Sequence, residues 1–450
     1  MKIQQISVKG LFGFFDHVIP LNMNERITII HSPNGFGKTA MLRMLNGVFN
    51  SQYSVFRRIP FSKFRVELDD GSSIEVVKTP SVLEKLYKKD QINLFFDKPN
   101  SEKVSFSLNA AKKEIDFPVD VLDDIIPGLE RVGLRTWVYL PTGESLLLNE
   151  VIDRFEDILP SETILQEEPE WLETLKNDIH VRLIESQRLL NIFPHRSSKL
   201  SSRASSSMLP TVSAYSDELA QLIQSKLAEY GTTSQSLDRT FPARVVQKQS
   251  PKLTDEQLRG QLKELEENRS RLVEVGLLDQ DNNSDLQIQP QDDIDPSTKN
   301  VLSVYVEDIE KKLSVFSEIA SKIELLRRII NSKFAYSYKE MNFNKERGFV
   351  FKTLHNPSHT TDTISPIDLS SGEQHELVLL YELLFKVEPN SLVLIDEPEL
   401  SLHVGWQAQF LKDLQEIIKL ADLDILMATH SPDIIQDRWD LTVELKGPAK

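Results

Sequence analysis

The sequence predicts an α/β fold that is interrupted by a helical insertion. A buried apolar strand at residues 25–30 leads into a Gly- and Asn-rich loop, and residues 39–49 then have helical spacing. The last hundred residues again alternate strand with helix, which is the pattern of a parallel sheet covered by helices. Between these parts, leucine-rich helical spacing runs from 258 to 323. A chain of 450 residues is long enough for two or three units with cores of their own.

The composition excludes several classes of protein. The chain has no cysteine, so it forms no disulfide and no thiolate metal site, which fits a reducing cytoplasm. Its first residues lack the apolar core of a signal peptide, and no apolar run is long enough to span a bilayer. The net charge of −16 argues against a surface covered by nucleic acid, although it leaves room for a local basic patch. We therefore expect a cytoplasmic protein without a membrane segment.

The N-terminal part is predicted to be mostly β-structure. Residues 2–8 alternate apolar and polar side chains, as a half-buried strand does. Residues 63–68 and 73–77 are predicted to form a β-hairpin across the turn at 69–71. A helix and then a strand at 180–184 complete this part.

The middle of the chain is predicted to be a helical insertion. It opens with a mobile loop at 196–207, which holds seven serines and three basic residues. Two helical arms follow, at 258–272 and 302–323, and we expect them to form an antiparallel hairpin of roughly 30 to 50 Å. Six aspartates and no basic residue at 279–295 predict a solvated tip between the arms. The predicted domain division is 1–195, 196–335 and 336–450.

A phosphate-binding loop lies between the strand at 25–30 and the helix after it. Backbone N–H groups and the helix N-terminus would face a phosphate anion there. Lys38 would reach the β- and γ-phosphates of ATP, and the hydroxyl of Thr39 would bind Mg²⁺. Ser32 departs from the usual pattern, which has its first glycine at this position. The predicted ATP-binding loop is Ser32, Pro33, Asn34, Gly35, Phe36, Gly37, Lys38 and Thr39.

A second apolar run, at 392–395, ends in the two acids Asp396 and Glu397. A carboxylate at the tip of a buried strand is costly unless a cation faces it, and Mg²⁺ beside the phosphate-binding loop would be that cation. Asp396 is therefore predicted to hold the metal. Glu397 is predicted to orient or deprotonate the attacking water, so the expected reaction is ATP hydrolysis.

A third motif, at 369–374, opens a predicted helix that continues through Leu384. By itself, a start rich in serine and glycine is typical of an ordinary helix cap. Together with the two motifs above it resembles the ABC signature, in which one subunit contacts the γ-phosphate that the other subunit holds. Ser371 stands where many members have a glycine. The resemblance implies nucleotide contacts from Ser370, Ser371, Gly372 and Glu373.

Three further assignments rest on the same resemblance. His430, after the apolar strand at 425–427, resembles the switch histidine that senses the γ-phosphate, and it joins Glu397 as a catalytic residue. Gln187 is our choice for the glutamine that links Mg²⁺ and water to the adjacent lobe. The aromatic residues of the turn at 12–14 either pack near the adenine or belong to a buried turn.

The spacing of these motifs resembles one branch of the ABC-type ATPases. More than three hundred residues separate Lys38 from the signature, whereas transporter subunits keep the two close. The layout is similar to the Rad50/SMC/RecF and OLD-like branch (AAA_15/AAA_21), in which helices interrupt an ATPase head made of a mixed β-sheet lobe and a parallel-sheet, RecA-like lobe. The string from Asp396 to His403 is typical of OLD-like ATPases. The insertion disfavours a transporter motor.

The resemblance also implies partners. The arms are too short to tether distant DNA, and no Toprim nuclease domain follows His430, so we expect a separate effector. The chain resembles stand-alone ATPase subunits of bacterial anti-phage defence modules, most like the AriA type of PARIS and next the PtuA type of Septu. This implies a homodimer around ATP, open to a higher-order homo-oligomer such as a trimer of dimers. It also implies a Toprim/DUF4435-like nuclease as effector and a phage-encoded trigger protein.

One alternative stays open, namely a RecF- or Rad50-like ATPase that binds DNA in repair or maintenance. A DNA clamp needs basic clusters on its surface. Such clusters are usually solvated faces, yet they are also able to bind DNA, tRNA or an acidic partner. The sequence-local clusters are Arg196/Lys199/Arg203, Arg327/Arg328 and Arg57/Arg58.

Overall fold

The computed structural model divides into two compact units. Met1–Leu209 and Lys386–Lys450 form the first, which we call the sheet unit, and Pro210–Phe385 forms the second, which we call the helical unit. The three-part division predicted from motifs groups the chain differently and stays a prediction. The described ranges are 1–79, 91–99, 101–108, 113–115, 122–126, 128–155, 164–166, 168–186, 190–191, 209–247, 254–279, 294–354, 363–400 and 402–448.

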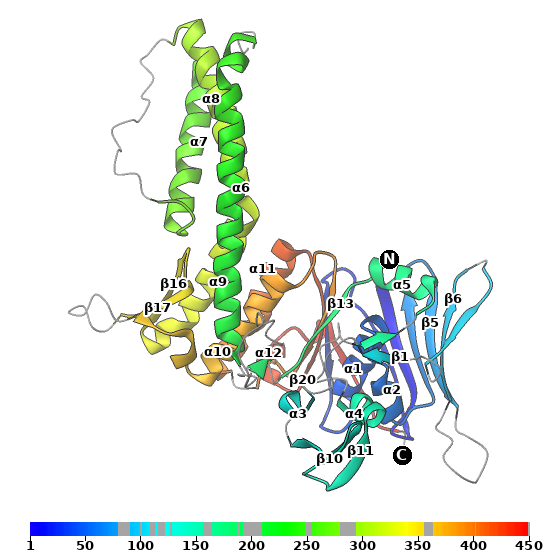
Figure 1. The fold of residues 1–450 in the computed structure, drawn as a ribbon. Helices are drawn as coiled ribbons and strands as arrows, with labels where there is room; N and C mark the ends of the chain where they lie inside the picture. The colour runs from blue at the N-terminus through cyan, green and yellow to red at the C-terminus, as the bar shows by residue number, and fades with distance from the viewer. Residues whose placement is uncertain are drawn as a thin grey trace, which may run out of the picture. The chain divides into compact units, whose positions relative to one another are not determined.

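A five-stranded parallel sheet forms one part of the sheet unit (Figure 1). Its strand order is β13-β19-β20-β3-β21, and every neighbouring pair is parallel. All residues of β19 are buried, which explains why its sequence is a continuous apolar run and not an alternating one. The strands are β3 (Ile27–His31), β13 (Val181–Ile184), β19 (Leu392–Asp396), β20 (Asp424–Thr429) and β21 (Thr442–Glu444).

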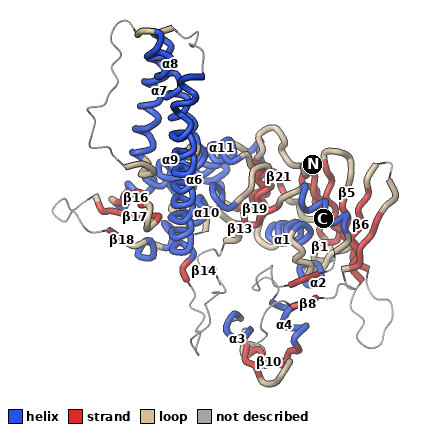
Figure 2. The backbone as a smooth tube through the Cα atoms, turned by 45° about the horizontal axis from the view of Figure 1, so that its top comes forward, coloured by secondary structure: helices blue, strands red, loops and turns tan. Residues whose placement is uncertain are grey.

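A six-stranded antiparallel sheet, of order β2-β1-β4-β5-β6-β7, forms the other part (Figure 2). The predicted hairpin is confirmed, since β4 and β5 pair with Lys63 opposite Val77. Helix α1 (Lys38–Phe49) shares one apolar core with residues of both sheets. The strands are β1 (Ile3–Leu11), β2 (Phe15–Pro20), β4 (Lys63–Leu68), β5 (Ser73–Thr79), β6 (Gln91–Asp97) and β7 (Val104–Ser107).

Short elements complete this part of the chain. A three-stranded sheet of order β11-β10-β9 forms a small apolar core with α3 and α4, and this core contains the buried Trp137 of β10. The helices are α2 (Ser54–Arg58), α3 (Leu122–Ile125), α4 (Leu148–Phe155), α5 (Glu170–Asp178), α11 (Val404–Ala421) and α12 (Pro432–Ile435). The strands are β8 (Lys113–Ile115), β9 (Leu129–Arg131), β10 (Thr136–Tyr139), β11 (Glu144–Leu147), β12 (Ile164–Gln166), β14 (Leu190–Asn191) and β15 (Leu209–Pro210).

The helical unit confirms the predicted insertion and adds a helix that the sequence did not reveal. Helix α6 spans 37 residues, but its buried side chains lie only in its first half, so the second half has no apolar stripe to detect. The helices are α6 (Thr211–Gln247), α7 (Asp255–Glu274), α8 (Pro296–Ser314), α9 (Ser317–Phe334) and α10 (Ser371–Tyr381). A small antiparallel sheet contains β16 (Lys339–Asn344), β17 (Gly348–Thr353) and β18 (Thr363–Ile364).

The pairing of the helices corrects the predicted hairpin. Helices α7 and α8 run parallel, because Asp255 at the start of α7 pairs with Lys299 at the start of α8. Helix α6 runs antiparallel to α8, with Asp238 2.7 Å from Lys312. The two predicted arms, at 258–272 and 302–323, therefore do not form an antiparallel hairpin.

Parts of the sequence prediction fall outside the described residues. They are the serine-rich loop at 196–207 and residues 280–293 of the acidic segment. Within the described ranges, no helix is long and apolar enough to cross a bilayer.

Candidate nucleotide site

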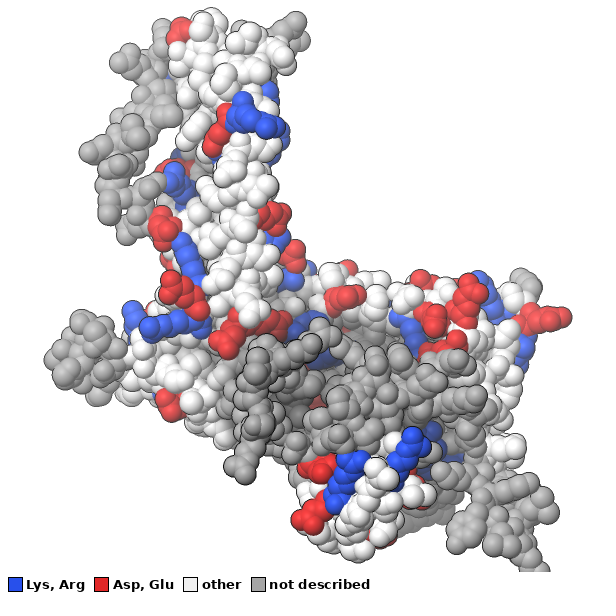
Figure 3. Space-filling view, in the orientation of Figure 1, with Lys and Arg blue, Asp and Glu red and all other residues white. Residues whose placement is uncertain are grey.

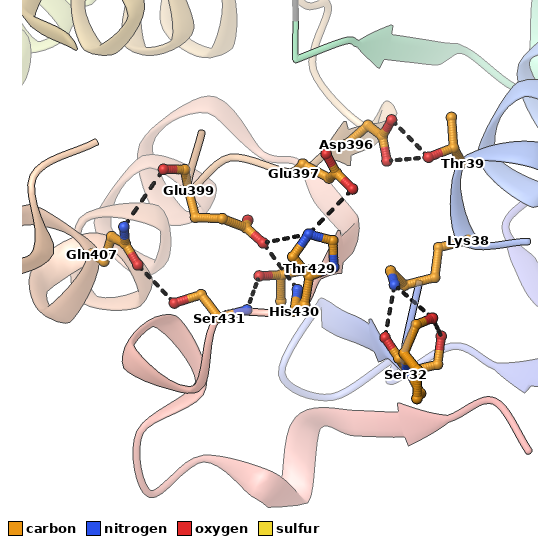
Figure 4. A network of polar contacts seen from close by, with 11 residues as sticks. Ser32, Lys38, Thr39, Asp396, Glu397, Glu399, Gln407, Thr429, His430 and Ser431 are labelled. Atoms are coloured by element: carbon orange, nitrogen blue, oxygen red, sulfur yellow. Dashed lines mark hydrogen bonds and ion pairs between the residues drawn. The ribbon is translucent and has the colours of Figure 1, made fainter. Parts of the chain in front are cut away.

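Three neighbouring strands of the parallel sheet bring the predicted motifs of the sheet unit to one edge. Strand β3 leads into the phosphate-binding loop, β19 ends at Asp396, and β20 is followed by His430. Because neighbouring parallel strands point the same way, the segments after their carboxyl ends meet at the same edge of the sheet. Figure 4 shows side chains from all three segments around this edge. Residues that are far apart in the chain thus share one site.

Two glycines give the phosphate-binding loop its shape. Gly35 and Gly37 have φ of 86° and 90°, in the left-handed region that favours glycine. A Cβ on Gly37 would also lie only 2.4 Å from Cδ2 of Leu11. The backbone of Ser32 lies outside the left-handed region, so this position does not require the glycine of the usual pattern.

Lys38 begins helix α1 and is 5% exposed. Its Nζ donates to the carbonyl oxygens of Ser32 at 2.8 Å and Pro33 at 3.4 Å. Burial lowers the pKa of Lys38, and attraction to nearby carboxylates, that of Glu397 foremost, opposes the shift. The ammonium group is therefore held inside the loop, near the acidic side chains at the end of β19.

Thr39 and Asp396 connect the loop to the end of β19. The Thr39 hydroxyl lies 3.0 Å from each carboxylate oxygen of Asp396, which is buried. Burial raises the pKa of Asp396, the hydrogen bond from Thr39 lowers it, and Glu397 raises it again. The carboxylate forms no ion pair with any described side chain.

These groups fit a magnesium ion. A hydroxyl and a carboxylate oxygen are ligands that Mg²⁺ prefers, and a buried carboxylate without a cation is costly. Gln187, the third predicted ligand, lies outside the described residues. In the part of the chain that the structure describes, no three histidine or acidic side chains converge as a metal cluster on their own.

Glu397 and His430 face each other at the same edge. Glu397 has a φ of 45°, a strained value for a side chain of this size, and its N–H donates to the Ala428 carbonyl at 2.9 Å. Its Oε1 lies 3.3 Å from Nε2 of His430. The Glu397 and His430 side chains are 26% and 33% exposed, so both reach solvent.

The structure adds three polar residues that the sequence interpretation had not assigned, namely Glu399, Gln407 and Ser431. Glu399 accepts the backbone N–H of His430 at 2.9 Å, and Ser431 donates its hydroxyl to Gln407 at 2.6 Å. Glu399 was visible in the acidic string after β19, but its partner depends on how β19 and β20 pair. No sequence motif near Gln407 indicated that it belongs to this site.

The aromatic turn between β1 and β2 is not buried. Phe12 and Phe14 are 38% and 58% exposed, which excludes the buried-turn interpretation. Phe15 connects the turn to the phosphate-binding loop, since its ring centroid lies 5.0 Å from that of Phe36. A contact between these rings and adenine stays a prediction.

The predicted signature lies in the helical unit, at the start of α10. Ser370 caps this helix in a capping box with Glu373. The buried Glu373 carboxylate also accepts from Ser337 at 2.7 Å and from Lys339 at 2.7 Å. Burial raises the pKa of Glu373, but hydrogen bonds from these partners lower it by more. Glu373 thus serves the helix cap, while the side chains of Ser370 and Ser371 remain exposed.

Comparison with known families gives one match over nearly the whole chain. A family model described as AAA ATPase domain (AAA_15) matches residues 1–435. Two curated proteins match over shorter stretches. Septu protein PtuA of Bacillus thuringiensis is 27% identical over 90 residues, which are 20% of this chain and 22% of PtuA. Protein ea59 of Escherichia phage lambda is 36% identical over 69 residues, 15% of this chain and 13% of ea59. The chain thus matches less than a quarter of either relative.

Solved structures give loose superpositions. The Smc head domain with an extended coiled coil, bound to the C-terminal domain of ScpA and derived from Pyrococcus furiosus, has a TM-score of 0.34 and 11% identity. That superposition covers 99% of this chain and 94% of the other. The SMC head domain from Thermotoga maritima has a TM-score of 0.33 and 10% identity, with 97% and 92% of the two chains covered. The strand order and the family match therefore carry more weight than these superpositions.

Proposed function

The chain belongs to the AAA_15 family of AAA ATPase domains, and from that premise we propose that it hydrolyses ATP between two copies of itself and thereby controls a separate effector in anti-phage defence. The observation that carries the ATPase part is the shared sheet edge. There the phosphate-binding loop, the buried Asp396 and the pair Glu397 and His430 come together from three parallel strands.

Each group at this edge has a task in phosphoryl transfer to water. Backbone N–H groups of the loop and the start of α1 bind the phosphates, and Lys38 contacts the β- and γ-phosphates. Mg²⁺, held by Thr39 and Asp396, would neutralise charge on these phosphates. Glu397 orients the attacking water and accepts its proton. His430 faces Glu397 and senses the γ-phosphate.

The second copy supplies the signature. The hydroxyls of Ser370 and Ser371 are exposed at the start of a helix, where N–H groups favour an anion. In the proposed dimer, these groups contact the γ-phosphate that the partner copy holds. Neither copy then has a complete site alone. A larger homo-oligomer, such as a trimer of dimers, would be built from such dimers.

The defence role rests on likeness to a relative. The matched stretch of Septu protein PtuA supports it. We propose that ATP holds an assembly with a Toprim/DUF4435-like nuclease in the cytoplasm, and that a phage-encoded trigger protein releases the nuclease.

The DNA-repair alternative lacks a specific observation in its favour. On the face in Figure 3, Lys and Arg alternate with Asp and Glu along the helices and do not gather in one patch. Arg327 donates to the side chain of Glu274 at 2.7 Å, so it is already paired. The cluster at 196–203 lies outside the described residues.

Glu397→Gln tests the proposed reaction. The variant keeps the size of the side chain and removes the carboxylate, so ATP should still bind. Its hydrolysis rate should fall by about 10²–10⁴-fold, because the water loses its base. Bound ATP should then hold the chain as a dimer. Phosphate release and light scattering measure the two effects, and a wild-type hydrolysis rate would rule out Glu397 as the catalytic residue.

Two control variants complete the experiment. Lys38→Ala should not bind fluorescent ATP and should stay monomeric. When it is mixed with a Gly372→Asp chain, hydrolysis should return, because one site of the mixed dimer has both an intact loop and an intact signature. No return of activity would count against the shared site.

The same trapped dimer tests the partner. The protein encoded beside this chain should copurify with Glu397→Gln in ATP and not with Lys38→Ala. A nuclease at that position supports the defence role, whereas a membrane permease would refute it.

A further inference from the structure

We propose that Glu399 is a positioning residue, which holds His430 in the orientation needed for ATP hydrolysis. This inference rests on the proposed ATPase function and gives a role to a residue that the sequence analysis left without one. It starts from one contact: Oε1 of Glu399 accepts the backbone N–H of His430 at 2.9 Å. The same oxygen lies 3.7 Å from Nε2 of the His430 ring.

The backbone explains why His430 needs such a partner. Strands β19 and β20 pair up to Asp396 and Ala428, and the Glu397 N–H still reaches the Ala428 carbonyl. Past this point the ladder between the two strands ends. The N–H of His430 would be left without an acceptor there, and Glu399 supplies one from the turn that follows β19.

Burial makes this contact specific. The Glu399 side chain is only 9% exposed, whereas the catalytic Glu397 is 26% exposed. Oε2 of Glu399 is buried and has no hydrogen-bond partner among the described residues. A buried carboxylate with one oxygen unpaired is costly, so it is retained for what the other oxygen does. That other oxygen holds His430.

The ring of His430 faces two carboxylates through one nitrogen. Nε2 lies 3.3 Å from Glu397 and 3.7 Å from Glu399. Both are ion-pair contacts, charged when the ring is protonated, and the one to Glu397 is the shorter. Glu399 therefore sets the position of the loop, and the ring then points at the catalytic carboxylate.

Helix α11 also holds the turns after β19 and β20, through Gln407. Gln407 accepts the Ser431 hydroxyl at 2.6 Å, and its amide donates to the Leu402 carbonyl at 3.1 Å. One side chain thus connects the turn after β19 to the turn after β20, as Figure 4 shows for its bond to Ser431. Glu399 and Gln407 together leave His430 little freedom to turn away from Glu397.

Glu399→Ala and Glu399→Gln test this role in the full-length chain. Alanine removes the acceptor, so kcat for ATP hydrolysis should fall by about 10²-fold while the KM for ATP stays near the wild-type value. Glutamine keeps an acceptor oxygen in place and should recover kcat to within about tenfold of wild type. Amide hydrogen exchange gives an independent measurement. Peptides that contain His430 should exchange faster in the alanine variant than in the glutamine variant.

Several outcomes would overturn the proposal. They are an unchanged kcat in Glu399→Ala, an equal loss of kcat in both variants, or a loss of kcat without faster exchange at His430. If Glu399→Ala does not fold, Gln407→Ala loosens the same loop from α11. It should lower kcat by a smaller factor and speed up the same exchange, and wild-type values for both would overturn the proposal.

The control separates this inference from the proposed function. Glu388→Gln removes an exposed carboxylate, 73% exposed, that lies 3.6 Å from His180 in the sheet unit and away from the motif residues. It should match wild type in kcat and in exchange. If wild type and this control do not hydrolyse ATP, the proposed function fails. If wild type and the control hydrolyse ATP with the same kcat as Glu399→Ala, only the positioning role fails.

Discussion

Two buried carboxylates, one in each unit, have pKa values that are shifted in opposite directions. Among the described side chains, Asp396 in the sheet unit hydrogen-bonds only with the Thr39 hydroxyl, and burial raises its pKa. Glu373 in the helical unit is equally buried, but Lys339, Ser337 and Ser370 more than offset the effect of burial, so its pKa is lowered.

This difference in partners distinguishes acids that stabilise the fold from acids that belong to the nucleotide site. A buried charge is retained either because the chain neutralises it or because something outside the chain does. The helical unit neutralises its own, and a second case is Glu376, which forms a fully buried ion pair with Lys333. In the sheet unit, no described side chain forms an ion pair with Asp396. This is the physical reason to place Mg²⁺ there and to regard the acids of α10 as part of the fold.

The largest effect is expected when a structural pair is broken. Lys333→Met leaves Glu376 charged and fully buried. The free energy of unfolding of this variant should be about 3–5 kcal/mol lower than that of wild type. Urea denaturation measures this. The double variant Lys333→Met/Glu376→Leu removes both charges and should recover most of the loss. A loss of less than about 1 kcal/mol in the single variant would mean that the pair is not a structural one.

The next prediction compares two aspartates of the same sheet. Asp396→Asn removes a charge that forms no ion pair with any side chain in the described ranges, so stability should equal or exceed that of wild type while hydrolysis is lost. Asp424, on β20, pairs with Lys2 at 2.8 Å and with Arg26 at 2.7 Å. Asp424→Asn should therefore lower the free energy of unfolding by about 1.5–3 kcal/mol and leave hydrolysis in place.

Unfolding in urea and phosphate release, measured on both variants, decide the comparison. If Asp396→Asn is the less stable of the two, the carboxylate has a structural role and the argument for a metal there weakens. If Asp424→Asn loses hydrolysis, the distinction between structural and site acids fails.

Much of this comparison could be predicted from sequence, because the motifs encode local geometry. Gly35 and Gly37 occupy positions that need a positive φ, and Asp396 ends a strand whose residues are all buried. The α/β fold, the helical insertion and the membership in an ATPase branch are confirmed by the structure and the family match. The roles of the nucleotide-contacting residues stay predictions.

What the sequence did not reveal depends on contacts between distant segments. The role of Glu399 follows from the pairing of β19 with β20, which places His430 beside it. That Glu373 is a helix-cap acid follows from Lys339, on a different strand. Helix α6 was not predicted because its buried residues all lie in its first half, and the parallel pairing of α7 with α8 has no local signature.

The smallest effect concerns Glu75, a structural acid within the sheet unit. Its carboxylate lies 2.6 Å from Lys63, 2.5 Å from Arg65 and 3.2 Å from Lys103. Burial raises the pKa of Glu75, but hydrogen bonds from these cations lower it to about 2, against 4.5 ordinarily. Whether a buried acid is structural therefore depends on its partners and not on the unit in which it lies.

Because the folded pKa of Glu75 is depressed, its contribution to stability is fully present above pH 4.5 and is lost as the pH falls toward 2. The loss should be about 1 kcal/mol, since the three cations are 35–44% exposed and solvent screens them. Glu75→Gln should be less stable than wild type at pH 6, and the difference should shrink as the pH falls through this window. Urea denaturation from pH 6 to pH 3 measures it. A difference that is constant with pH would mean that the three cations do not hold Glu75 ionised, and the comparison would then rest on Glu373 and Glu376 alone.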